Sequence, residues 1–356
     1  MHNHISRLLF RWILRESSLS EDKMDSNPTS LTTQNNPHSF PKCPIGDNMK
    51  KMKKGPTTPK GFRDIDPELA KKRREVINKI AGVLEEFGFV PLETPTLEFA
   101  ETLLGKYGEE ERLIYQFTDR GGRKLALRFD LTVPLARFMA NNLGLLKPTF
   151  SRYQVGQVFR GEKPQKGRFR EFTQFDFDTL GSNSLEEDAK IIAAAIKSAR
   201  QLGLEKAIMA INDRKNFEGL PQDVVRTWDK YHKIGLDGIK KELSTKGFSA
   251  SEIDKFISIL DKKRKTERLN KVRKILESNY GLVFGEDFFL DNTLARGLDY
   301  YTGLVFELLP DNKIDADRGI SIGGGGRYDN LIGMFAGREI PAVGFSFGLA
   351  RIIELL

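Results

Sequence analysis

Residues Phe159–Asp178 read FRGEKPQKGRFREFTQFDFD and predict the architecture around them. Two strand-like runs flank a polar loop at 161–167, which is the pattern of a β-hairpin. Five cations fall within eleven positions: Arg160, Lys163, Lys166, Arg168 and Arg170. Like charges packed this densely cost stability unless an anion binds among them, and arginine forks bind phosphate oxygens in pairs. The hairpin therefore predicts a polyphosphate clamp.

The second run of the hairpin also carries a polar face. In a strand, every second side chain points to the same side, which here groups Arg168, Arg170, Phe172, Gln174, Asp176 and Asp178. Gln174 and Asp178 then lie about 13 Å apart, and a small ligand with an ammonium group could bind from that face. The alternative is a solvent-exposed face with ordinary charge pairs. Four phenylalanines between positions 169 and 177 argue against it.

Composition limits the chemistry that the chain can perform. Its 356 residues suit one large domain with an insertion, or two domains, and the net charge of +8 permits a nucleic-acid partner without requiring one. No apolar run approaches the roughly 18 residues that span a membrane, so we expect no membrane partner. The single cysteine, Cys43, excludes a cysteine metal cluster. With only four histidines, chemistry must depend on Arg, Tyr, carboxylates and amides, and we expect no metal held by the protein itself.

Residues 1–55 have the composition of a disordered tail, rich in Ser, Thr, Asn, Pro and Lys. Within it, Ile5–Leu14 is amphipathic and arginines recur every fourth residue. This pattern fits an organelle-targeting segment within residues 1–20, or an over-extended N-terminus upstream of a later start such as Met24. We favour the second interpretation, and with it a cytoplasmic protein; the organellar location is the alternative.

The remaining chain predicts an α+β fold, in which helices flank an antiparallel sheet. Helical periodicity covers Pro67–Phe87 and Leu185–Leu202, the second with a capping box formed by Ser184 and Glu187. Between them the hairpin strands are predicted at Phe150–Phe159 and Phe169–Phe177. Residues 220–284 are rich in Lys and Glu and purely helical in pattern. We therefore predict a catalytic domain in two parts, 56–219 and 285–356, interrupted by a helical insertion at 220–284.

Four further segments carry candidate functional residues, each with a structural alternative. They are RFDLT at 128–132, LARGLDYYTG at 294–303, SIGGGGRYD at 321–329, and PAVGFSFGLARIIELL at 341–356. The acidic and hydroxyl groups of the first could simply cap a helix. Arg296 in the second could pair with a carboxylate, and its strand pattern would place Tyr300 and Tyr301 on opposite faces. The glycine run lacks the P-loop ending and more often marks a tight turn.

Together these segments resemble the histidyl-tRNA synthetases, a class II aminoacyl-tRNA synthetase family. The resemblance covers residues 61–356. Phe89–Pro95 resembles the first class motif, whose proline lies at a homodimer interface; FRGEKPQKGRFREF resembles the second motif and GFSFGLAR the third. LARGLDYYTG and GGGGRYD resemble two motifs specific to the histidine enzymes.

The resemblance implies a role for individual residues. Arg160 and Arg296 would neutralise the ATP α-phosphate as catalytic residues, Glu162 would read the adenine amino group, and Arg168 and Arg351 would bind the terminal phosphates. The histidine site would comprise Asp130, Thr132, Gln174 and Asp178 around the α-amino group, with Tyr300, Tyr301 and Tyr328 around the imidazole. The implied substrates are L-histidine, ATP with Mg²⁺, and histidine tRNA, and the implied assembly is a homodimer.

The chain ends at Leu356, without the C-terminal anticodon-binding domain that members of the family normally carry. A paralogue shares this architecture: the histidine-binding regulatory subunit of ATP phosphoribosyltransferase, which makes no adenylate. Such a sensor needs the histidine residues but has no use for Arg160, Arg168, Arg296 and Arg351 together. Because all four are present, the sequence favours the ligase over the sensor.

Overall fold

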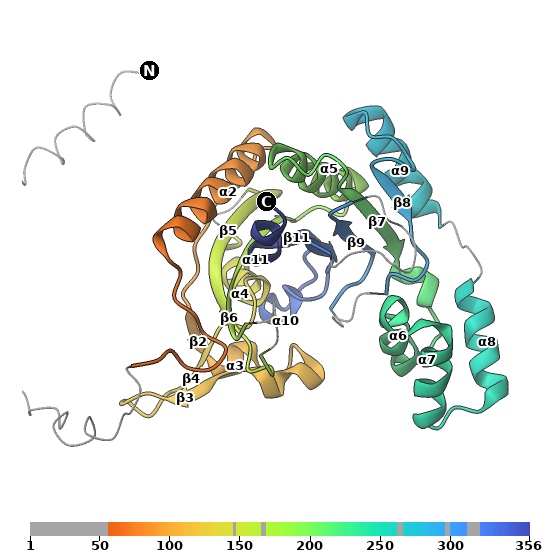
Figure 1. Cartoon of the computed structure of the whole chain (residues 1–356), viewed down its shortest axis with the longest axis horizontal. Coiled ribbons are helices and arrows are strands. Elements are labelled where there is room, and N and C mark those ends of the chain that lie inside the picture. The colour runs from red at the N-terminus through yellow and green to blue at the C-terminus, as the bar shows by residue number, and fades with distance from the viewer. Residues whose placement is uncertain (1–55, 145–146, 165–168, 262–265, 296–299, 312–320) are drawn as a thin grey trace, which may run out of the picture. The chain divides into compact units, whose positions relative to one another are not determined.

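The computed structural model describes residues 56–144, 147–164, 169–261, 266–295, 300–311 and 321–356 (Figure 1). Residues Thr58–Leu356 form one compact unit. Its centre is an eight-stranded sheet, whose strands in spatial order are β1 (Val90–Pro91), β5 (Phe150–Phe159), β6 (Glu171–Leu180), β11 (Ala342–Gly348), β10 (Gly323–Arg327), β9 (Leu304–Leu309), β7 (Ile208–Asp213) and β8 (Phe288–Leu290). Only the edge pairs β1–β5 and β7–β8 are parallel. The sheet is mixed but mainly antiparallel, and the predicted α+β class is confirmed.

One face of the sheet is covered by α2 (Pro67–Glu86), α5 (Leu185–Gln201), α9 (Glu267–Tyr280) and α11 (Leu349–Leu355). Figure 1 shows α2, α5 and α9 side by side along that face. The strands contribute fully buried aromatic side chains to this core, among them Phe175, Phe177 and Phe347. Because strand side chains alternate, burying these aromatics turns the intervening polar residues of β6 and β11 to the opposite face. That opposite face holds the site.

The helix starts follow local side-chain chemistry. Asp66 accepts a hydrogen bond from the Leu69 N–H at 2.9 Å, and Pro67 occupies the first helical position of α2. Ser184 caps α5, but its hydroxyl bonds the Glu186 N–H and carboxylate. The predicted capping box with Glu187 is therefore wrong. The Glu187 carboxylate forms an ion pair with Lys190 instead, with Oε2 2.5 Å from Lys190 Nζ.

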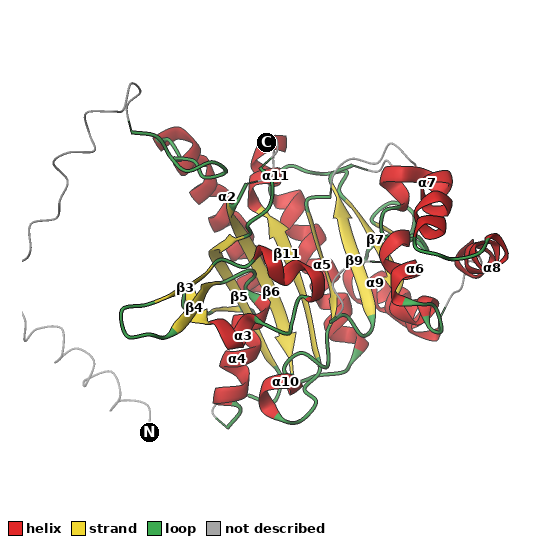
Figure 2. Ribbon diagram, turned by 90° about the horizontal axis from the view of Figure 1, so that it is seen from below, coloured by secondary structure: helices red, strands yellow, loops and turns green. Residues whose placement is uncertain are grey.

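A second, smaller sheet lies beside the first and consists of β2 (Leu97–Phe99), β4 (Lys124–Leu127) and β3 (Gln116–Thr118). On the site-bearing face, α3 (Ala100–Leu103), the 3₁₀ helix η2 (Gly108–Leu113), α4 (Thr132–Asn142) and α10 (Gly333–Ala336) contribute side chains to a second core. Figure 2 shows α3 and α4 close to the smaller sheet. In the described part of the chain, no helix combines the length and apolarity that crossing a membrane needs.

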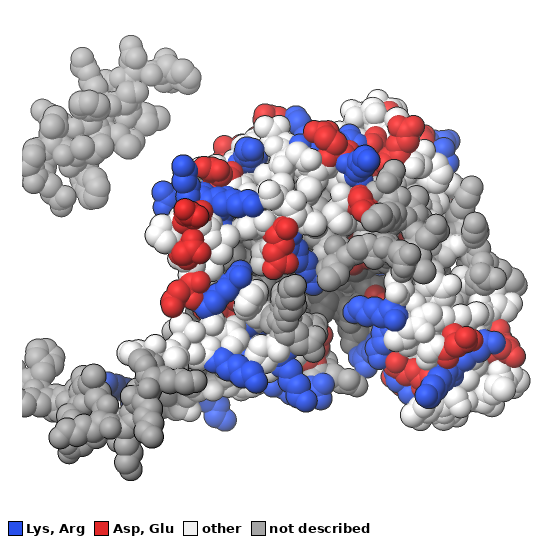
Figure 3. All heavy atoms as spheres, in the orientation of Figure 1, with Lys and Arg blue, Asp and Glu red and all other residues white. Residues whose placement is uncertain are grey.

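Helices α6 (Gln222–Trp228), α7 (Tyr231–Thr245) and α8 (Ala250–Asp261) pack around a third core of their own. We call them the helical unit; they lie at one end of the molecule in Figure 1. Helix α9 follows in sequence but packs into the main core through Leu269, Val272 and Leu276. The surface of the helical unit mixes both charge signs, with ion pairs such as Lys240–Asp254 (Figure 3). The predicted boundaries of an inserted domain at 220–284 stay a prediction.

Candidate active site

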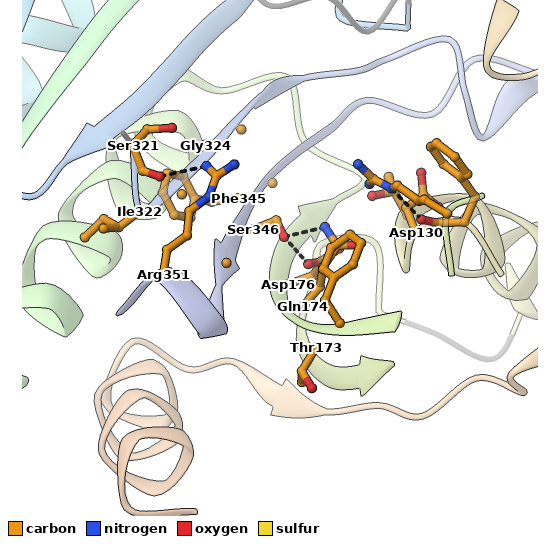
Figure 4. A pocket seen from close by; sticks show the side chains of 18 of the residues that line it. Asp130, Thr173, Gln174, Asp176, Ser321, Ile322, Gly324, Phe345, Ser346 and Arg351 are labelled. Atoms are coloured by element: carbon orange, nitrogen blue, oxygen red, sulfur yellow. Dashed lines mark hydrogen bonds between the residues drawn. The ribbon is translucent and has the colours of Figure 1, made fainter. Parts of the chain in front are cut away.

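A cavity of about 260 Å³ lies on the site-bearing face of the sheet, opposite α2 and α5 (Figure 4). Gln174, Asp176 and Asp178 of β6 line it, as the predicted alternation of that strand requires. The middle of the cavity is formed by β10 and β11, where Ser346 pairs with Asp176 across the sheet. The polar face predicted from the hairpin is thus the wall of a pocket.

The glycine run forms a central strand of the sheet, so its interpretation as a tight turn is wrong. β10 lies between β9 and β11, and its backbone lines the cavity. A Cβ on Gly325 would lie 2.0 Å from the Gly344 carbonyl oxygen, and one on Gly344 would lie 1.8 Å from Asp178 Oδ1. Side chains at these positions would fill the space where the strands and the carboxylate approach each other.

Asp178 lies at the end of the cavity and is fixed by two partners. Arg152 of β5, its cross-strand neighbour, places Nη2 2.7 Å from Oδ2, and the Tyr328 hydroxyl donates to Oδ1 at 2.5 Å. Burial raises the pKa of Asp178, while the charge of Arg152 and the Tyr328 hydrogen bond oppose the rise. The carboxylate is preformed, because the fold supplies both partners.

Asp176 and Gln174 share Ser346 as a hydrogen-bond partner. The Ser346 hydroxyl donates to Asp176, and Gln174 Nε2 donates to Ser346 Oγ at 2.9 Å. Burial raises the pKa of Asp176 to about 7, with Asp178 adding to the rise and Arg152 opposing it. Gln174 Oε1 is a buried acceptor with no hydrogen-bond partner among the described residues. A ligand donor in the cavity would satisfy it.

Asp130 combines a capping role with a place in the cavity wall. Its Oδ1 accepts the Val133 N–H of α4 at 3.0 Å and the Tyr107 hydroxyl at 3.0 Å. Asp130 therefore satisfies a first-turn N–H of α4, although the N-cap position itself is Leu131, and it lines the cavity together with Thr132. Burial raises the pKa of Asp130, and the Val133 hydrogen bond and the charge of Arg160 oppose the rise.

Three tyrosines close this end of the cavity. The rings of Tyr300 and Tyr301 lie 4.8 Å apart, and those of Tyr300 and Tyr328 lie 5.9 Å apart. Tyr300 and Tyr301 both line the cavity, so their predicted separation onto opposite faces is wrong. The reason is that neither residue belongs to a strand, and side-chain alternation does not apply to them. Burial raises the pKa of Tyr300 well above its usual value.

Arg160, Glu162 and Arg351, the described residues predicted to bind ATP, also line the cavity. The Arg160 guanidinium stacks over the Phe129 ring at 4.4 Å and donates to the Phe129 carbonyl oxygen at 3.2 Å. Glu162 lines the same cavity. Arg351 donates to the Ser321 carbonyl oxygen at 2.8 Å, and Figure 4 shows it across Ser346 and Gln174 from Asp130. Arg168 and Arg296 lie outside the described residues.

Sequence reasoning missed three supporting residues, namely Tyr107, Arg152 and Ser346. Arg152 could have been found, since pairing the predicted hairpin strands brings it close to Asp178 across the ladder. Ser346 alternates with buried phenylalanines in β11, which is the same signal that identified Gln174 in β6. Tyr107 precedes a 3₁₀ helix far from the motifs, and no local pattern connects it with Asp130.

Comparison with known proteins gives consistent matches. A family model described as histidyl-tRNA synthetase matches residues 61–226 and 238–352. The histidine–tRNA ligase of Aeropyrum pernix is 44% identical over 325 residues, covering 84% of this chain and 74% of the relative. That of Korarchaeum cryptofilum is 38% identical over 320 residues, covering 83% and 74%.

Solved structures show the same architecture. The histidyl-tRNA synthetase from Nostoc sp. PCC 7120 superposes with a TM-score of 0.69 at 31% identity, covering 84% of this chain and 75% of that one. A Bacillus halodurans protein described as an ATP phosphoribosyltransferase regulatory subunit/histidyl-tRNA synthetase gives a TM-score of 0.68 at 25% identity, covering 84% and 83%. Similarity of fold therefore does not separate a ligase from a histidine sensor, and the side chains of the pocket must do so.

Proposed function

The chain belongs to the histidyl-tRNA synthetase family, and from this premise we propose how its pocket performs the reaction of a histidine–tRNA ligase. The enzyme activates L-histidine with ATP to histidyl-adenylate and transfers the histidyl group to histidine tRNA. The observation that carries the assignment is one cavity lined by three buried carboxylates and by Arg160 and Arg351. It offers carboxylates to an ammonium group and guanidinium groups to phosphates.

The histidine substrate is assigned to the end with the carboxylates and tyrosines. Asp130, Thr132, Gln174 and Asp178 would surround the α-amino group and its neighbours. The unpartnered Gln174 Oε1 supports this placement, because an ammonium hydrogen would satisfy it. Tyr300, Tyr301 and Tyr328 would enclose the imidazole, whose flat ring suits the tilted aromatic walls.

ATP is assigned to the arginines. Arg160, fixed by Phe129 beside Asp130, would contact the α-phosphate and the histidine carboxylate, and Arg296 would contact the same phosphate. Glu162 would accept the adenine amino group, while Arg168 and Arg351 would hold the terminal phosphates. For Arg168 and Arg296, which lie outside the described residues, these assignments rest on the sequence alone.

In the first step, a carboxylate oxygen of histidine attacks the ATP α-phosphorus and the bond to the bridging oxygen of pyrophosphate breaks. No general base is needed, because the nucleophile is already an anion. The guanidinium groups neutralise the charge that grows on the phosphoryl oxygens. In the second step, the terminal ribose hydroxyl of the tRNA attacks the histidyl carbonyl and AMP leaves.

Magnesium is proposed to arrive with the ATP phosphates as part of the substrate. The pocket carboxylates fit a metal poorly, since each already accepts hydrogen bonds from the fold and they lie at the histidine end. Across the described ranges, no group of three or more His, Cys, Asp or Glu side chains could hold an ion.

Histidine-dependent ATP–pyrophosphate exchange tests the proposal directly. We expect exchange that requires both L-histidine and ATP, with no exchange when other amino acids replace histidine. A well-folded chain that binds histidine without exchanging pyrophosphate would overturn the ligase in favour of the histidine sensor. The side chains favour the ligase, because a sensor has no use for Arg160 and Arg351 in the same cavity.

We also propose that the enzyme is a homodimer. Four large apolar side chains on the first strands are exposed in the single chain: Val90 at 47%, Leu97 at 43%, Phe99 at 51% and Phe117 at 44%. Exposed apolar patches of this kind mark interaction surfaces, and a second copy would also cover the edge strand β1. Sedimentation should show a dimer that Phe99→Asp dissociates; a monomeric wild type would refute the proposal.

The proposed compartment is the cytoplasm, with an organelle as the alternative if residues 1–20 act as a targeting segment. The two are distinguished by expressing the full chain and a variant starting at Met24, each fused to a fluorescent protein. Cytoplasmic fluorescence of both supports the proposal, whereas organellar fluorescence of the full chain alone would support targeting.

A further inference from the structure

The segment that leads into the tyrosine pair contacts the helical unit at Asn292, Thr293 and Ala295. The Trp228 Nε1–H of α6 donates to the Asn292 carbonyl oxygen at 3.4 Å. His232 Nε2 of α7 forms a short hydrogen bond to Thr293 Oγ1. Ala295 is fully buried in the core of the helical unit. The His232 side chain is therefore hydrogen-bonded to this segment, although no function was predicted for it from the sequence.

The direction of these hydrogen bonds follows from their geometry. Thr293 Oγ1 donates its hydrogen to Asp291 Oδ1 at 2.5 Å, so the same oxygen must accept from His232 Nε2–H. Asp291 Oδ1 also accepts the Thr293 N–H at 2.8 Å, which fixes the turn. A chain of hydrogen bonds thus runs from α7 to the turn that precedes the tyrosines.

The next residue lies in a different core. Leu294 is buried in the cluster that also contains Tyr301 and Tyr328, whereas its neighbour Ala295 is buried with Trp228. Leu294 therefore belongs to the core at the histidine end of the pocket, and the adjacent Ala295 belongs to the core of the helical unit. Leu294 directly follows the turn at 291–293 and is buried in a close-packed core. A shift of the turn would therefore displace Leu294 and disturb the packing of that core.

Both ends of the tyrosine-bearing segment are tied to the strand–helix junction that precedes the helical unit. Arg214 follows β7 in the 3₁₀ helix η3 (Arg214–Phe217), where its N–H donates to the Gly303 carbonyl oxygen at 2.9 Å. Its Nη1 donates to the Ala295 carbonyl oxygen at 3.2 Å. Asn212 Nδ2 donates to the Leu294 carbonyl oxygen at 2.9 Å. Residues 296–299, between these two ends, lie outside the described ranges.

We propose that Trp228 and His232 of the helical unit are positioning residues for histidine recognition, acting through the turn at 291–293 on the Tyr300–Tyr301 pair. The inference rests on the proposed function of that pocket. It implies that the helical unit is needed for binding histidine, not only for contacts elsewhere. It also implies a smaller effect on ATP, because Arg160 and Glu162 follow β5 and Arg351 lies on α11, whereas only Arg296 of the proposed ATP contacts follows the tied segment.

The test compares kinetic constants for ATP–pyrophosphate exchange by the full chain with its His232→Ala, His232→Gln and Lys240→Ala variants. Loss of one buried hydrogen bond predicts a KM for histidine about tenfold higher in His232→Ala, with the KM for ATP changed less than about twofold. His232→Gln retains an N–H donor and should recover most of the affinity. Lys240→Ala alters an exposed ion pair of the same unit and should match the wild type.

An unchanged KM for histidine in a folded His232→Ala variant would overturn the proposal, as would equal rises for both substrates. If His232→Ala does not fold, Trp228→Phe removes the indole N–H while keeping an aromatic ring, and the same selective rise is expected. If the wild type shows no exchange, the ligase assignment fails separately. Calorimetric titration with L-histidine then tests the positioning role, with the same tenfold difference expected.

Discussion

The two ends of the pocket are built in different ways. At the histidine end, Asp130, Asp176 and Asp178 are 4%, 2% and 3% exposed, and each is hydrogen-bonded by other side chains or by a helix N–H. At the phosphate end, Arg160 is half-buried and Arg351 is exposed, and each donates to a main-chain carbonyl oxygen. The fold therefore buries and preorganises the amino-acid site, while the two arginines stay partly or fully exposed and are held by main-chain carbonyl oxygens. Substitutions at the first end should affect stability, and those at the second should affect rate.

The largest effect is expected for Arg152→Ala, which removes the partner of Asp178 and leaves a buried carboxylate unpaired. Breaking a buried ion pair from one side costs about 3–5 kcal/mol in the free energy of unfolding. Urea denaturation measures this loss. Arg351→Ala, at the other end, should change the free energy of unfolding by less than about 0.5 kcal/mol.

The double variant Arg152→Met/Asp178→Leu separates an unpaired charge from lost packing. It should regain much of the stability, because apolar residues of similar volume often replace a buried ion pair without loss. Equal stability of Arg152→Ala and Arg351→Ala would contradict the difference between the two ends.

Arg160→Ala tests the phosphate end. Losing one preorganised donor to a developing negative charge should lower kcat for exchange by about 10²–10³-fold, or about 2.7–4 kcal/mol. The free energy of unfolding should fall by less than about 1 kcal/mol, as for a partly exposed side chain. Arg160→Lys keeps the charge but not the two-donor fork, so its kcat should lie between those of the wild type and the alanine variant. A loss of stability matching the loss of rate would place Arg160 with the structural residues.

Asp176 makes the stability of the histidine end depend on pH. Burial raises its pKa from 3.8 to about 7, so the folded protein keeps a proton that the unfolded chain releases between these values. Protonated Asp176 thus stabilises the fold at low pH, and this contribution falls as pH rises toward 7. Between pH 5.5 and pH 7 the loss is about 2 kcal/mol, at about 1.4 kcal/mol per pH unit.

The Asp176→Asn variant cannot titrate at this position. The difference in free energy of unfolding between wild type and variant, measured in urea at pH 5.5, 6.5 and 8, should change with pH and then level off above pH 7. A difference that is constant across this range would show that Asp176 is ionised throughout.

The same contrast explains which parts of the site the sequence could predict. Gln174, Asp176 and Asp178 follow from strand alternation, a local rule, and β6 obeys it. The glycine run could not be assigned correctly, because its meaning depends on Gly344 and Asp178 approaching from other strands. Tyr300 and Tyr301 were expected on opposite faces of an extended segment, but the strand begins only at Leu304, after both tyrosines.

The fold was predictable for a related reason. Helix and strand periods are set by side chains within one segment, and the aromatic runs of β6 and β11 indicated which faces are buried. The contacts that support the pocket are long-range: Tyr107 meets Asp130, and Ser346 meets Asp176 across 170 residues. No local pattern specifies such pairs, so the residues that support the site were missed more often than those that line it.

Tyr107→Phe is expected to have the smallest effect and tests the histidine end most narrowly. The variant removes one hydroxyl from Asp130, which keeps its hydrogen bond from the Val133 N–H at 3.0 Å. The loss of one such hydrogen bond is about 1 kcal/mol, or roughly fivefold in the KM for histidine, with kcat and the KM for ATP nearly unchanged. Tyr280→Phe is the matched control, because Tyr280 stacks on Phe87 at the opposite face of the sheet. If Tyr107→Phe changed the KM for ATP as much as that for histidine, Asp130 would serve both substrates and the two ends of the pocket would not be independent.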